Sequence, residues 1–351
     1  MRDIELEQAI DLLLAHAAPV RETERVPLLD AVGRTAAEEV RAGFDNPPFD
    51  RSPLDGYTFA AASTRAASAE HPVRLHVIGE ECAGDFFAGT VGAGECVRIM
   101  TGGAIPAGCD CVVRQEDVRE DGDAIHVSFP SEPYENYCCA GEDIKKGTLL
   151  IQKGQVITAA HIAVLASEGY GDVSVYRRVR AAVASTGDEL LQPGEPLQPG
   201  KIYNSNLYLL AGRLKELGAE VTVLGSVPDD VERAAEVIAS YADHVDLFLT
   251  SGGVSVGKKD IMHGVVPALG AERLFWRVCM KPGAPAIAYT RGAMLGIALS
   301  GNPFAAYATF ELMARPVLAR LSGRSEVLPV RRRAVLADAF PKDCPGRRFL
   351  R

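Results

Sequence analysis

The spacing of hydrophobic residues changes along the chain, and each change predicts a different kind of structure. Residues 4–17 carry apolar side chains three and four positions apart, a spacing that predicts one amphipathic helix. A shorter helix is predicted for residues 31–40. Between residues 46 and 137, short apolar stretches alternate with glycine- and proline-rich turns, which predicts a small β domain. Its strands are expected at 73–78, 95–99 and 111–113.

The following segment returns to mixed structure. A hairpin is predicted over residues 146–157, a helix over 159–168 and a strand near 173–176. We expect this segment to pack on the N-terminal helices, which makes the β domain an insertion.

From residue 180 onward, apolar strands alternate with helical segments. Strands are expected at 181–185, 221–224, 245–250, 274–280 and 294–299, and helices at 206–217, 231–241, 259–269 and 304–321. The first of these helices has Asn204 or Ser205 as its N-cap. Apolar strands joined by helices predict a three-layer α/β domain, in which helices cover both faces of a parallel sheet.

Together these patterns predict an α/β multidomain protein. The parallel α/β domain covers residues 180–323, and the turn-rich β domain is inserted at 46–140. A mixed helical and β domain combines residues 1–45 with 141–179.

Composition and charge exclude several classes of function. A net charge of -9 argues against nucleic acid as a partner, because binding a polyphosphate backbone needs a basic surface. No apolar run approaches the roughly 20 residues of a membrane span, and the charged N-terminus lacks the apolar core of a signal peptide. The eight cysteines form no CxxC pair, so we expect reduced thiols in the cytoplasm, with a cysteine zinc site as the alternative.

Small polar residues follow the predicted strands, where an open α/β sheet binds its ligands. The segment 250–257, called here the glycine-rich loop, contains Gly252, Gly253 and Gly257, which let the backbone bend tightly and approach a ligand. Its amides, with the hydroxyl groups of Ser251 and Ser255, predict a phosphate site. The alternative is a plain strand-to-helix turn, since the loop matches neither a P-loop nor the GxGxxG pattern.

Acidic residues follow three of the same strands: Glu189, Asp229 and Asp260, with Asp188 and Asp230 beside them. Carboxylates next to a phosphate loop repel an anionic ligand unless a cation lies between them, and Mg²⁺ uses one or two carboxylates plus ligand oxygens. The alternative for each acid is a helix N-cap or a solvated charge. A nucleophilic triad is not predicted, because the chain has no GxSxG elbow and its seven histidines are scattered.

Short motifs between residues 46 and 303 occur in the order found in one known family. They read NPPFDRSPLDGY at 46–57, MTGGAIPAGCDCVV at 100–113, GEDIKKG at 141–147, STGDEL at 185–190, TSGGVSVGKKD at 250–260 and GNP at 301–303. This set resembles the molybdopterin molybdenumtransferase family, the molybdenum insertases that include the E domain of gephyrin. The motif at 250–260 resembles the molybdopterin-binding signature, which adenylylating proteins share.

The resemblance implies a step of molybdenum-cofactor synthesis. Molybdenum from molybdate would be inserted into adenylylated molybdopterin, with release of AMP, in a Mg²⁺-dependent reaction. Glu189, Asp229 and Asp260 would bind the metal or the phosphates. Residues carried over to substrate binding are Thr250, Ser251, Gly252, Gly253, Ser255, Gly257, Arg277, Gly301 and Asn302.

The resemblance also implies a homodimer with shared active sites. Asp55, Thr101 and Asp143 would reach the active site of the other subunit, and Lys281 with Arg277 would supply positive charge for molybdate or pyrophosphate. A molybdopterin adenylyltransferase and a molybdoenzyme are further possible partners. The implied location is the cytoplasm.

The chain departs from the family pattern in the part of the predicted site that would bind molybdate. Ala284 stands where the family has lysine, Ala305 where it has serine, and Arg277 where lysine is usual. Each lost charged hydrogen bond would weaken molybdate binding by ~1.5–3 kcal/mol. Residues 324–351 resemble the start of the family's C-terminal β domain, cut short. A paralogue that binds molybdopterin as a carrier or scaffold is therefore the alternative function, whereas residues 46–140 argue against adenylyl transfer.

Overall fold

The computed structural model describes residues 1–257, 260–335, 337–338 and 347–350, which form two compact units. Unit 1 comprises Met1–Glu39, Ile151–Ala163 and Gly171–Arg351, and unit 2 comprises Val40–Leu150 and Val164–Tyr170. The finer division into four domains stays a prediction.

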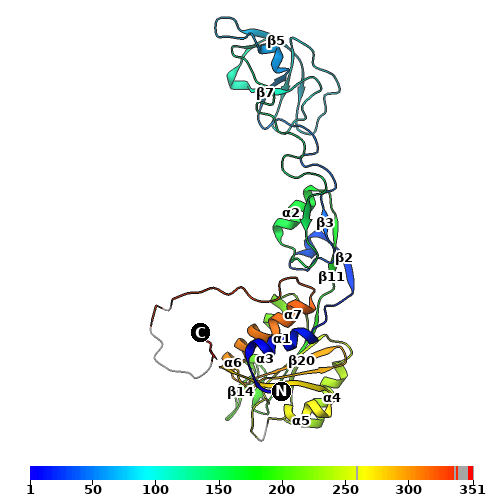
Figure 1. Ribbon diagram of the computed structural model, residues 1–351, viewed down its shortest axis with the longest axis vertical. Helices are drawn as coiled ribbons and strands as arrows, with labels where there is room; N and C mark the ends of the chain where they lie inside the picture. Colours follow the sequence, from blue (N-terminus) through cyan, green and yellow to red (C-terminus); the bar gives the residue numbers. More distant parts are fainter. Residues whose placement is uncertain (258–259, 336, 339–346, 351) are drawn as a thin grey trace. The chain divides into compact units, whose positions relative to one another are not determined.

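Unit 1 is built on a sheet with helices packed against it (Figure 1). The sheet has seven strands in the order β1-β17-β19-β20-β16-β12-β15. The strands are β1 Arg2–Ile4, β12 Arg180–Thr186, β15 Glu220–Val227, β16 Leu247–Ser251, β17 Glu272–Val278, β19 Ile287–Arg291 and β20 Met294–Leu299. All run in the same direction except β19, which is antiparallel to both of its neighbours.

The predicted parallel sheet is confirmed, with one antiparallel strand, β19. This strand was not predicted, and the two-residue turn after Arg291, with Gly292 at a φ of +59°, joins it to β20 as a hairpin. Such a short connection pairs strands only in antiparallel fashion, whereas parallel neighbours need a long crossover. The short strand β1, which pairs with β17, was also missed.

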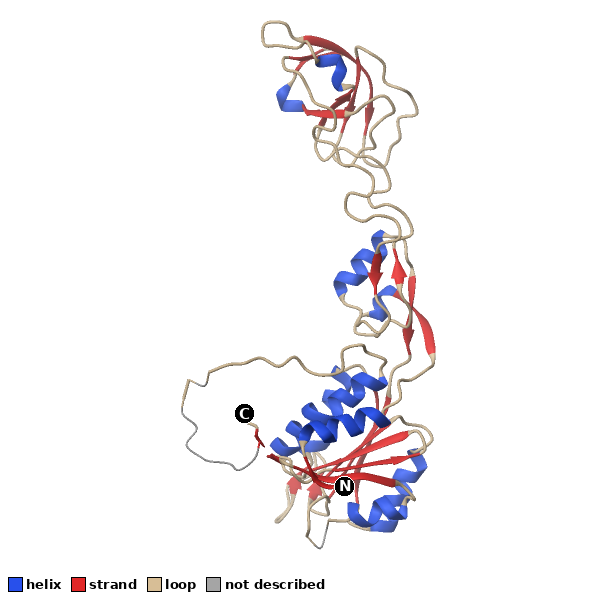
Figure 2. Ribbon diagram, in the orientation of Figure 1, coloured by secondary structure: helices blue, strands red, loops and turns tan. Residues whose placement is uncertain are grey.

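Helices cover both faces of this sheet, as predicted (Figure 2). One buried cluster joins the sheet to α1 Leu6–His16, α3 Ser205–Glu216, α6 Pro303–Thr309, the π-helical turn η4 Phe310–Ala314 and α7 Arg315–Leu321. A second cluster joins the other face to α4 Val231–Tyr241 and α5 Met262–Ala268. The predicted helix 304–321 is thus confirmed but contains a π turn. The predicted start of the helix at 259 lies outside the described residues.

The path of the chain through the sheet creates a ligand-binding edge. From β12 the chain passes through α3 to β15 on one side, and then through α4 to β16 on the other side of β12. Because α3, which follows β12, and α5, which follows β16, cover opposite faces, the loops that leave these two strands diverge and open a crevice between them. This topological switch point is where an α/β sheet binds its ligands.

Unit 2 contains a six-stranded sheet in the order β7-β4-β6-β5-β9-β8. The strands are β4 Gly56–Phe59, β5 Val73–Glu81, β6 Glu95–Ile99, β7 Cys111–Arg114, β8 Arg119–Asp121 and β9 Ala124–Val127, with short 3-10 turns η2 Ala61–Thr64 and η3 Gln115–Asp117. The three predicted strands are confirmed, and β4, β8 and β9 were missed. Phe59, Leu75 and Ile125 are fully buried in its core.

Two further strand pairs correct the prediction for the mixed segments. β2 Thr23–Pro27 pairs with β11 Asp172–Tyr176, and β3 Val40–Arg41 pairs with β10 Leu149–Ile151, so the predicted hairpin at 146–157 is wrong. The helix α2 Ala159–Ser167 and the strand near 173–176 are confirmed.

The predicted helix at 31–40 is also wrong. A 3-10 turn, η1 Leu28–Ala31, ends before Gly33 at a φ of +77°, and Thr35 and Ala36 form isolated bridges to Val156 and Val175. Local helical spacing here yields to backbone hydrogen bonds with segments distant in sequence, such as Ala36 N to Gln155 O at 2.9 Å.

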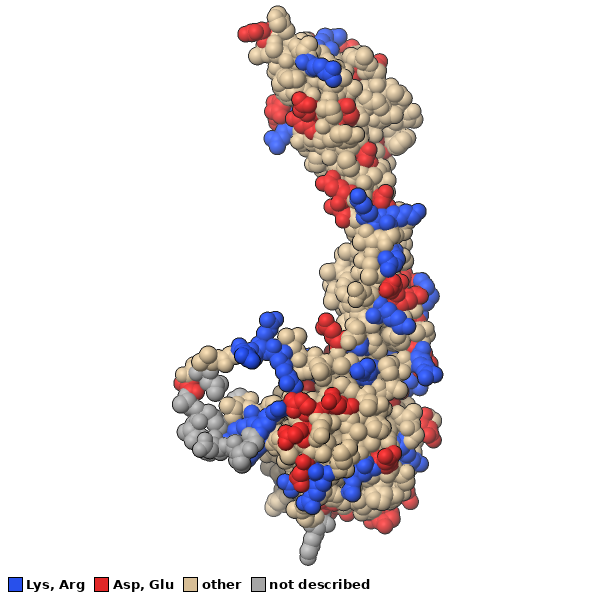
Figure 3. Space-filling view, viewed as in Figure 1, with Lys and Arg blue, Asp and Glu red and all other residues tan. Residues whose placement is uncertain are grey.

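Small pairs complete the secondary structure: β13 Leu190–Leu191 with β14 Ile202–Tyr203, and β18 Met280–Lys281 with β21 Arg347–Arg348. None of the helices formed by the described residues has the length and apolar character required to cross a membrane. Acidic and basic side chains are interspersed on the visible face of both units (Figure 3).

Candidate functional site

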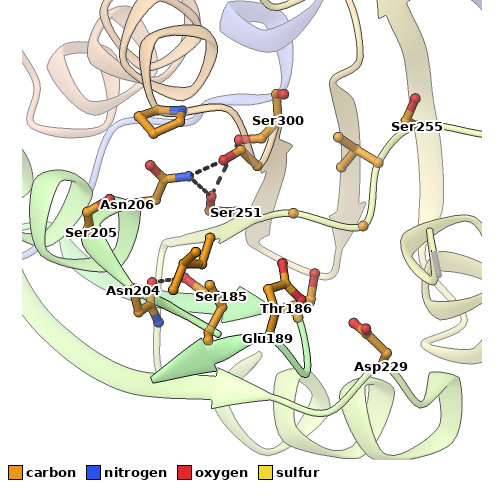
Figure 4. A pocket seen from close by; sticks show the side chains of 18 of the residues that line it. Ser185, Thr186, Glu189, Asn204, Ser205, Asn206, Asp229, Ser251, Ser255 and Ser300 are labelled. Atoms are coloured by element: carbon orange, nitrogen blue, oxygen red, sulfur yellow. Dashed lines mark hydrogen bonds between the residues drawn. The ribbon is translucent and has the colours of Figure 1, made fainter. Parts of the chain in front are cut away.

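A cavity of about 320 Å³ lies at the switch point of unit 1, at the carboxyl ends of β12, β15, β16 and β20 (Figure 4). Its lining comprises Ser185, Thr186, Gly187, Glu189, Leu190, Ile202, Tyr203, Asn204, Ser205, Asn206, Asp229, Ser251, Gly252, Gly253, Val254, Ser255, Asp260, Ser300, Gly301 and Pro303. Eight of the predicted site residues are in this set: Glu189, Asp229, Ser251, Gly252, Gly253, Ser255, Asp260 and Gly301.

The glycine-rich loop passes close to the end of β12. Gly252 and Gly253 have φ angles of +100° and +66°, which favour glycine. A Cβ atom on Gly252 would lie 2.6 Å from the carbonyl oxygen of Thr186. The ends of β12 and β16 therefore approach each other closely because Gly252 and Gly253 have no side chain, and both glycines line the cavity.

Asp260 changes the prediction for the loop amides. Its two carboxylate oxygens accept hydrogen bonds from the amides of Ser255, at 2.8 Å, and Gly257, at 2.5 Å. These two amides close the loop on itself, so the expectation that successive amides all face a phosphate is wrong for them. Gly257 lines a separate cavity of about 750 Å³ beside Trp276, and Thr250 is buried beneath the loop.

The three predicted metal-binding carboxylates share the cavity but come from different strand ends. Glu189 follows β12, Asp229 follows β15, and Asp260 follows the glycine-rich loop. Asp229 also accepts a long hydrogen bond from the amide of Asp188, at 3.4 Å. Across the described chain, His, Cys, Asp and Glu side chains form no group of three that could hold a metal alone.

The predicted basic residues lie elsewhere. The Nε atom of Arg277 is 3.0 Å from a carboxylate oxygen of Asp3, and Lys281 is exposed on β18. Neither residue lines the 320 Å³ cavity, and its described lining contains no lysine, arginine or histidine. Asn302 caps α6 by accepting a hydrogen bond from the amide of Ala305, at 3.1 Å. These three residues therefore lie outside the cavity lining, and their contacts to the substrate stay a prediction.

Two asparagines at the start of α3 belong to the site and were not predicted there. Asn204 was expected only as a cap; its Oδ1 accepts hydrogen bonds from the amide of Leu207 and the hydroxyl of Ser185. Asn206 donates to Ser251 Oγ and to the carbonyl oxygen of Gly301. The helix start beside an expected strand-end loop is the sequence signal that could have identified them.

In unit 2, two of the predicted residues contact each other. The Oδ1 atom of Asp55 accepts hydrogen bonds from the amide and the hydroxyl of Thr101, both at 2.7 Å. These bonds, the backbone bond first, hold the pKa of Asp55 below its ordinary value of 3.8. Asp143 lies 3.5 Å from the guanidinium of Arg51. The two carboxylates therefore have different partners.

Comparisons with known proteins agree with this architecture. The family model "MoeA N-terminal region (domain I and II)" matches residues 4–169, and the model "Probable molybdopterin binding domain" matches residues 182–320. The second match covers the strands and loops that form the cavity.

Individual relatives match nearly the whole chain. The molybdopterin molybdenumtransferase of Bacillus subtilis is 37% identical over 342 residues, 96% of this chain and 80% of its own length, and that of Staphylococcus aureus is 37% identical over 327 residues. A crystal structure of the molybdopterin biosynthesis protein MoeA from Pyrococcus horikoshii has a TM-score of 0.80 and 32% identity over 93% of this chain and 81% of that one. With this similarity extending through both units and the cavity, the chain belongs to the molybdopterin molybdenumtransferase family, a family of transferases that act in molybdenum-cofactor biosynthesis.

Proposed function

We propose that this chain inserts molybdenum from molybdate into adenylylated molybdopterin, with release of AMP, in a Mg²⁺-dependent step. One observation carries the proposal: the glycine-rich loop and three carboxylates, Glu189, Asp229 and Asp260, line the same cavity at the switch point. The described lining offers an anionic substrate acidic groups and no basic side chain. Because these three carboxylates repel an anion, a phosphorylated ligand would bind with a cation beside it.

The carboxylates fit Mg²⁺ in their chemistry, because this ion prefers oxygen ligands. Glu189 and Asp229 would hold it together with phosphate oxygens, and Asp260 would contribute through the lone pairs that the loop amides leave free. Bound there, Mg²⁺ would neutralise phosphate charge and make AMP a better leaving group.

The protein's own groups bind and orient the substrate. The hydroxyls of Ser251 and Ser255 can donate to phosphate oxygens, and Gly252 and Gly253 allow those oxygens to approach the backbone closely. Leu190 and Ile202 add apolar side chains to the lining. These contacts act on the phosphate half of the substrate.

We further propose that the active chain is a homodimer in the cytoplasm. Asp55, Thr101 and Asp143 of a second copy would complete each site and supply the contacts to the oxyanion, together with Lys281. A molybdopterin adenylyltransferase would deliver the substrate, and a molybdoenzyme would receive the product.

A second candidate function is supported by two substitutions. Ala284 and Ala305 replace a lysine and a serine of the family pattern, and Ala305 is buried in α6. A protein that binds adenylylated molybdopterin without inserting metal, as a carrier or scaffold, would tolerate both changes.

One assay separates the two candidates. Full-length protein is mixed with adenylylated molybdopterin and Mg²⁺, molybdate is titrated, and AMP release is followed. We expect molybdate-dependent AMP release that EDTA and Glu189→Gln abolish. The exposed Glu195→Gln is the matched control and should behave as wild type. Tight substrate binding without molybdate-dependent AMP release would instead establish the carrier function.

A further inference from the structure

The side chain of Asn206 lies at a junction of the site loops. The residue is in the first turn of α3 and is 8% exposed. Its position is fixed by the neighbouring cap, because Asn204 Oδ1 accepts hydrogen bonds from Leu207 N, at 3.3 Å, and from Ser185 Oγ, at 3.0 Å. The start of α3 is thereby attached to the end of β12.

From this fixed point the amide of Asn206 reaches two other loops. Its Nδ2 donates to Ser251 Oγ and to the carbonyl oxygen of Gly301, both at 2.8 Å, as the dashed lines in Figure 4 show for Ser251. Ser251 Oγ in turn donates to the carbonyl oxygen of Ser300, at 3.4 Å. One NH₂ group, with both hydrogens used, therefore joins the loop after β16 to the loop after β20.

The oxygen atom of the same amide limits how much these hydrogen bonds contribute to stability. Asn206 Oδ1 is buried and has no hydrogen-bond partner in the described part of the chain. An unpaired buried acceptor is unfavourable, and this cost offsets much of what the two donated bonds contribute to stability. The amide is thus a weak source of stability and a strong constraint on geometry.

We propose that Asn206 is a positioning residue, whose amide fixes the spacing of the glycine-rich loop and the loop at Ser300 and Gly301. This inference rests on the proposed function, because Gly252 of one loop and Gly301 of the other, both predicted to bind the substrate, line the same cavity. Loops held at the correct spacing before binding need no ordering when the substrate enters, so their affinity is higher.

The test compares Asn206→Leu, which keeps the branched shape and removes both donated bonds, with Thr58→Val. Thr58 is fully buried in unit 2 and donates from Oγ1 to the carbonyl oxygen of Cys111, at 2.9 Å, so its variant also loses a buried donor at nearly constant shape. Two properties are measured in the full chain: amide hydrogen exchange in both loops without ligand, and affinity for molybdopterin without molybdate.

For Asn206→Leu we expect faster exchange in both loops and molybdopterin binding weakened about 10- to 100-fold, with a melting temperature no lower than that of Thr58→Val. Thr58→Val should leave exchange in both loops and affinity unchanged. Unchanged exchange in either loop of Asn206→Leu would overturn the inference, as would wild-type affinity. If Asn206→Leu does not fold, Asn206→Asp replaces it in the exchange measurement, because an acidic residue in the first helical turn favours α3.

The proposed function is tested separately. Wild-type protein that binds molybdopterin but releases no AMP would refute metal insertion, while the comparison of affinities and exchange rates would still decide the role of Asn206. If the wild type does not bind molybdopterin, the proposed function fails, and the exchange rates alone decide whether the amide couples the two loops.

Discussion

The contact between Gly252, Gly253 and Thr186 gives a prediction that can be worked out atom by atom. A Cβ atom on Gly252 would lie 2.6 Å from the backbone oxygen of Thr186 and 2.8 Å from its Oγ1. A Cβ atom on Gly253 would lie 2.9 Å from the same Oγ1, and its next neighbours, both in Ile261, are at 3.5 Å. Alanine at 252 therefore meets backbone, whereas alanine at 253 meets chiefly a removable hydroxyl.

The size of each effect follows from a control in the same unit. Gly292 has a φ of +59° and open space around it, so Gly292→Ala reports the conformational cost alone, about 1–2 kcal/mol. Steric overlap adds about 1–3 kcal/mol at Gly252 and Gly253. Adding Thr186→Ala should recover the free energy of unfolding that Gly253→Ala loses to steric overlap. It should recover little of that loss in Gly252→Ala. The buried Oγ1 has no partner among the described residues, so its removal costs little.

Urea unfolding followed by tryptophan fluorescence measures these differences, because the only tryptophan, Trp276, lies in unit 1. Gly252→Ala and Gly253→Ala should also each bind molybdopterin at least about tenfold more weakly than wild type, since the glycine-rich loop must shift. Equal recovery of both glycine variants by Thr186→Ala would refute the assigned contacts. A cost at Gly252 no larger than at Gly292 would refute the close approach itself.

Three further predictions follow from other contacts. Asp260→Ala removes the acceptor of two loop amides and should abolish Mg²⁺-dependent AMP release. The free energy of unfolding should fall by only about 1–3 kcal/mol. Unchanged turnover would exclude this carboxylate from the metal site. Thr101→Ala should raise the pKa of Asp55 part of the way towards 3.8, which NMR titration of the carboxyl carbon would measure. The stabilisation that this carboxylate gives the fold is present above pH 3.8 and is lost as the pH falls through its lowered folded-state pKa. An unaltered titration would show that the hydroxyl bond is absent. Burial raises the pKa of Cys96 and Cys111 to about 12, so iodoacetamide at pH 8 should label them only after unfolding, as mass spectrometry would detect; labelling in the folded chain would contradict their burial.

Much of the fold could be predicted where local and tertiary preferences agree. The helix α4 was predicted with its observed bounds, and β16 and β20 closely, because their apolar patterns match the faces that are buried. The failures lie where a contact distant in sequence decided. Residues 31–40 have helical spacing but bridge to other strands, and β19 became an antiparallel strand because a two-residue turn follows it.

The candidate site divides in the same way. Strand ends in a parallel sheet meet at one edge, so the sequence alone placed Glu189, Asp229 and the glycine-rich loop together. It could not show that Asp260 takes two of the loop amides, or that Arg277 pairs with Asp3 near the N-terminus. The first outcome depends on the direction of the Asp260 side chain, and the second on a contact between residues far apart in sequence.

The sequence by itself determined the family, the alternation of strands and helices in unit 1, and the chemistry available at each strand end. Only the tertiary structure decided which of those groups share one cavity, because this depends on the order of strands in the sheet and on the faces that the crossover helices cover. The amide of Asn206 illustrates the difference: its identity is local, but its two acceptors, Ser251 and Gly301, lie 45 and 95 residues away and meet it only after the sheet has formed.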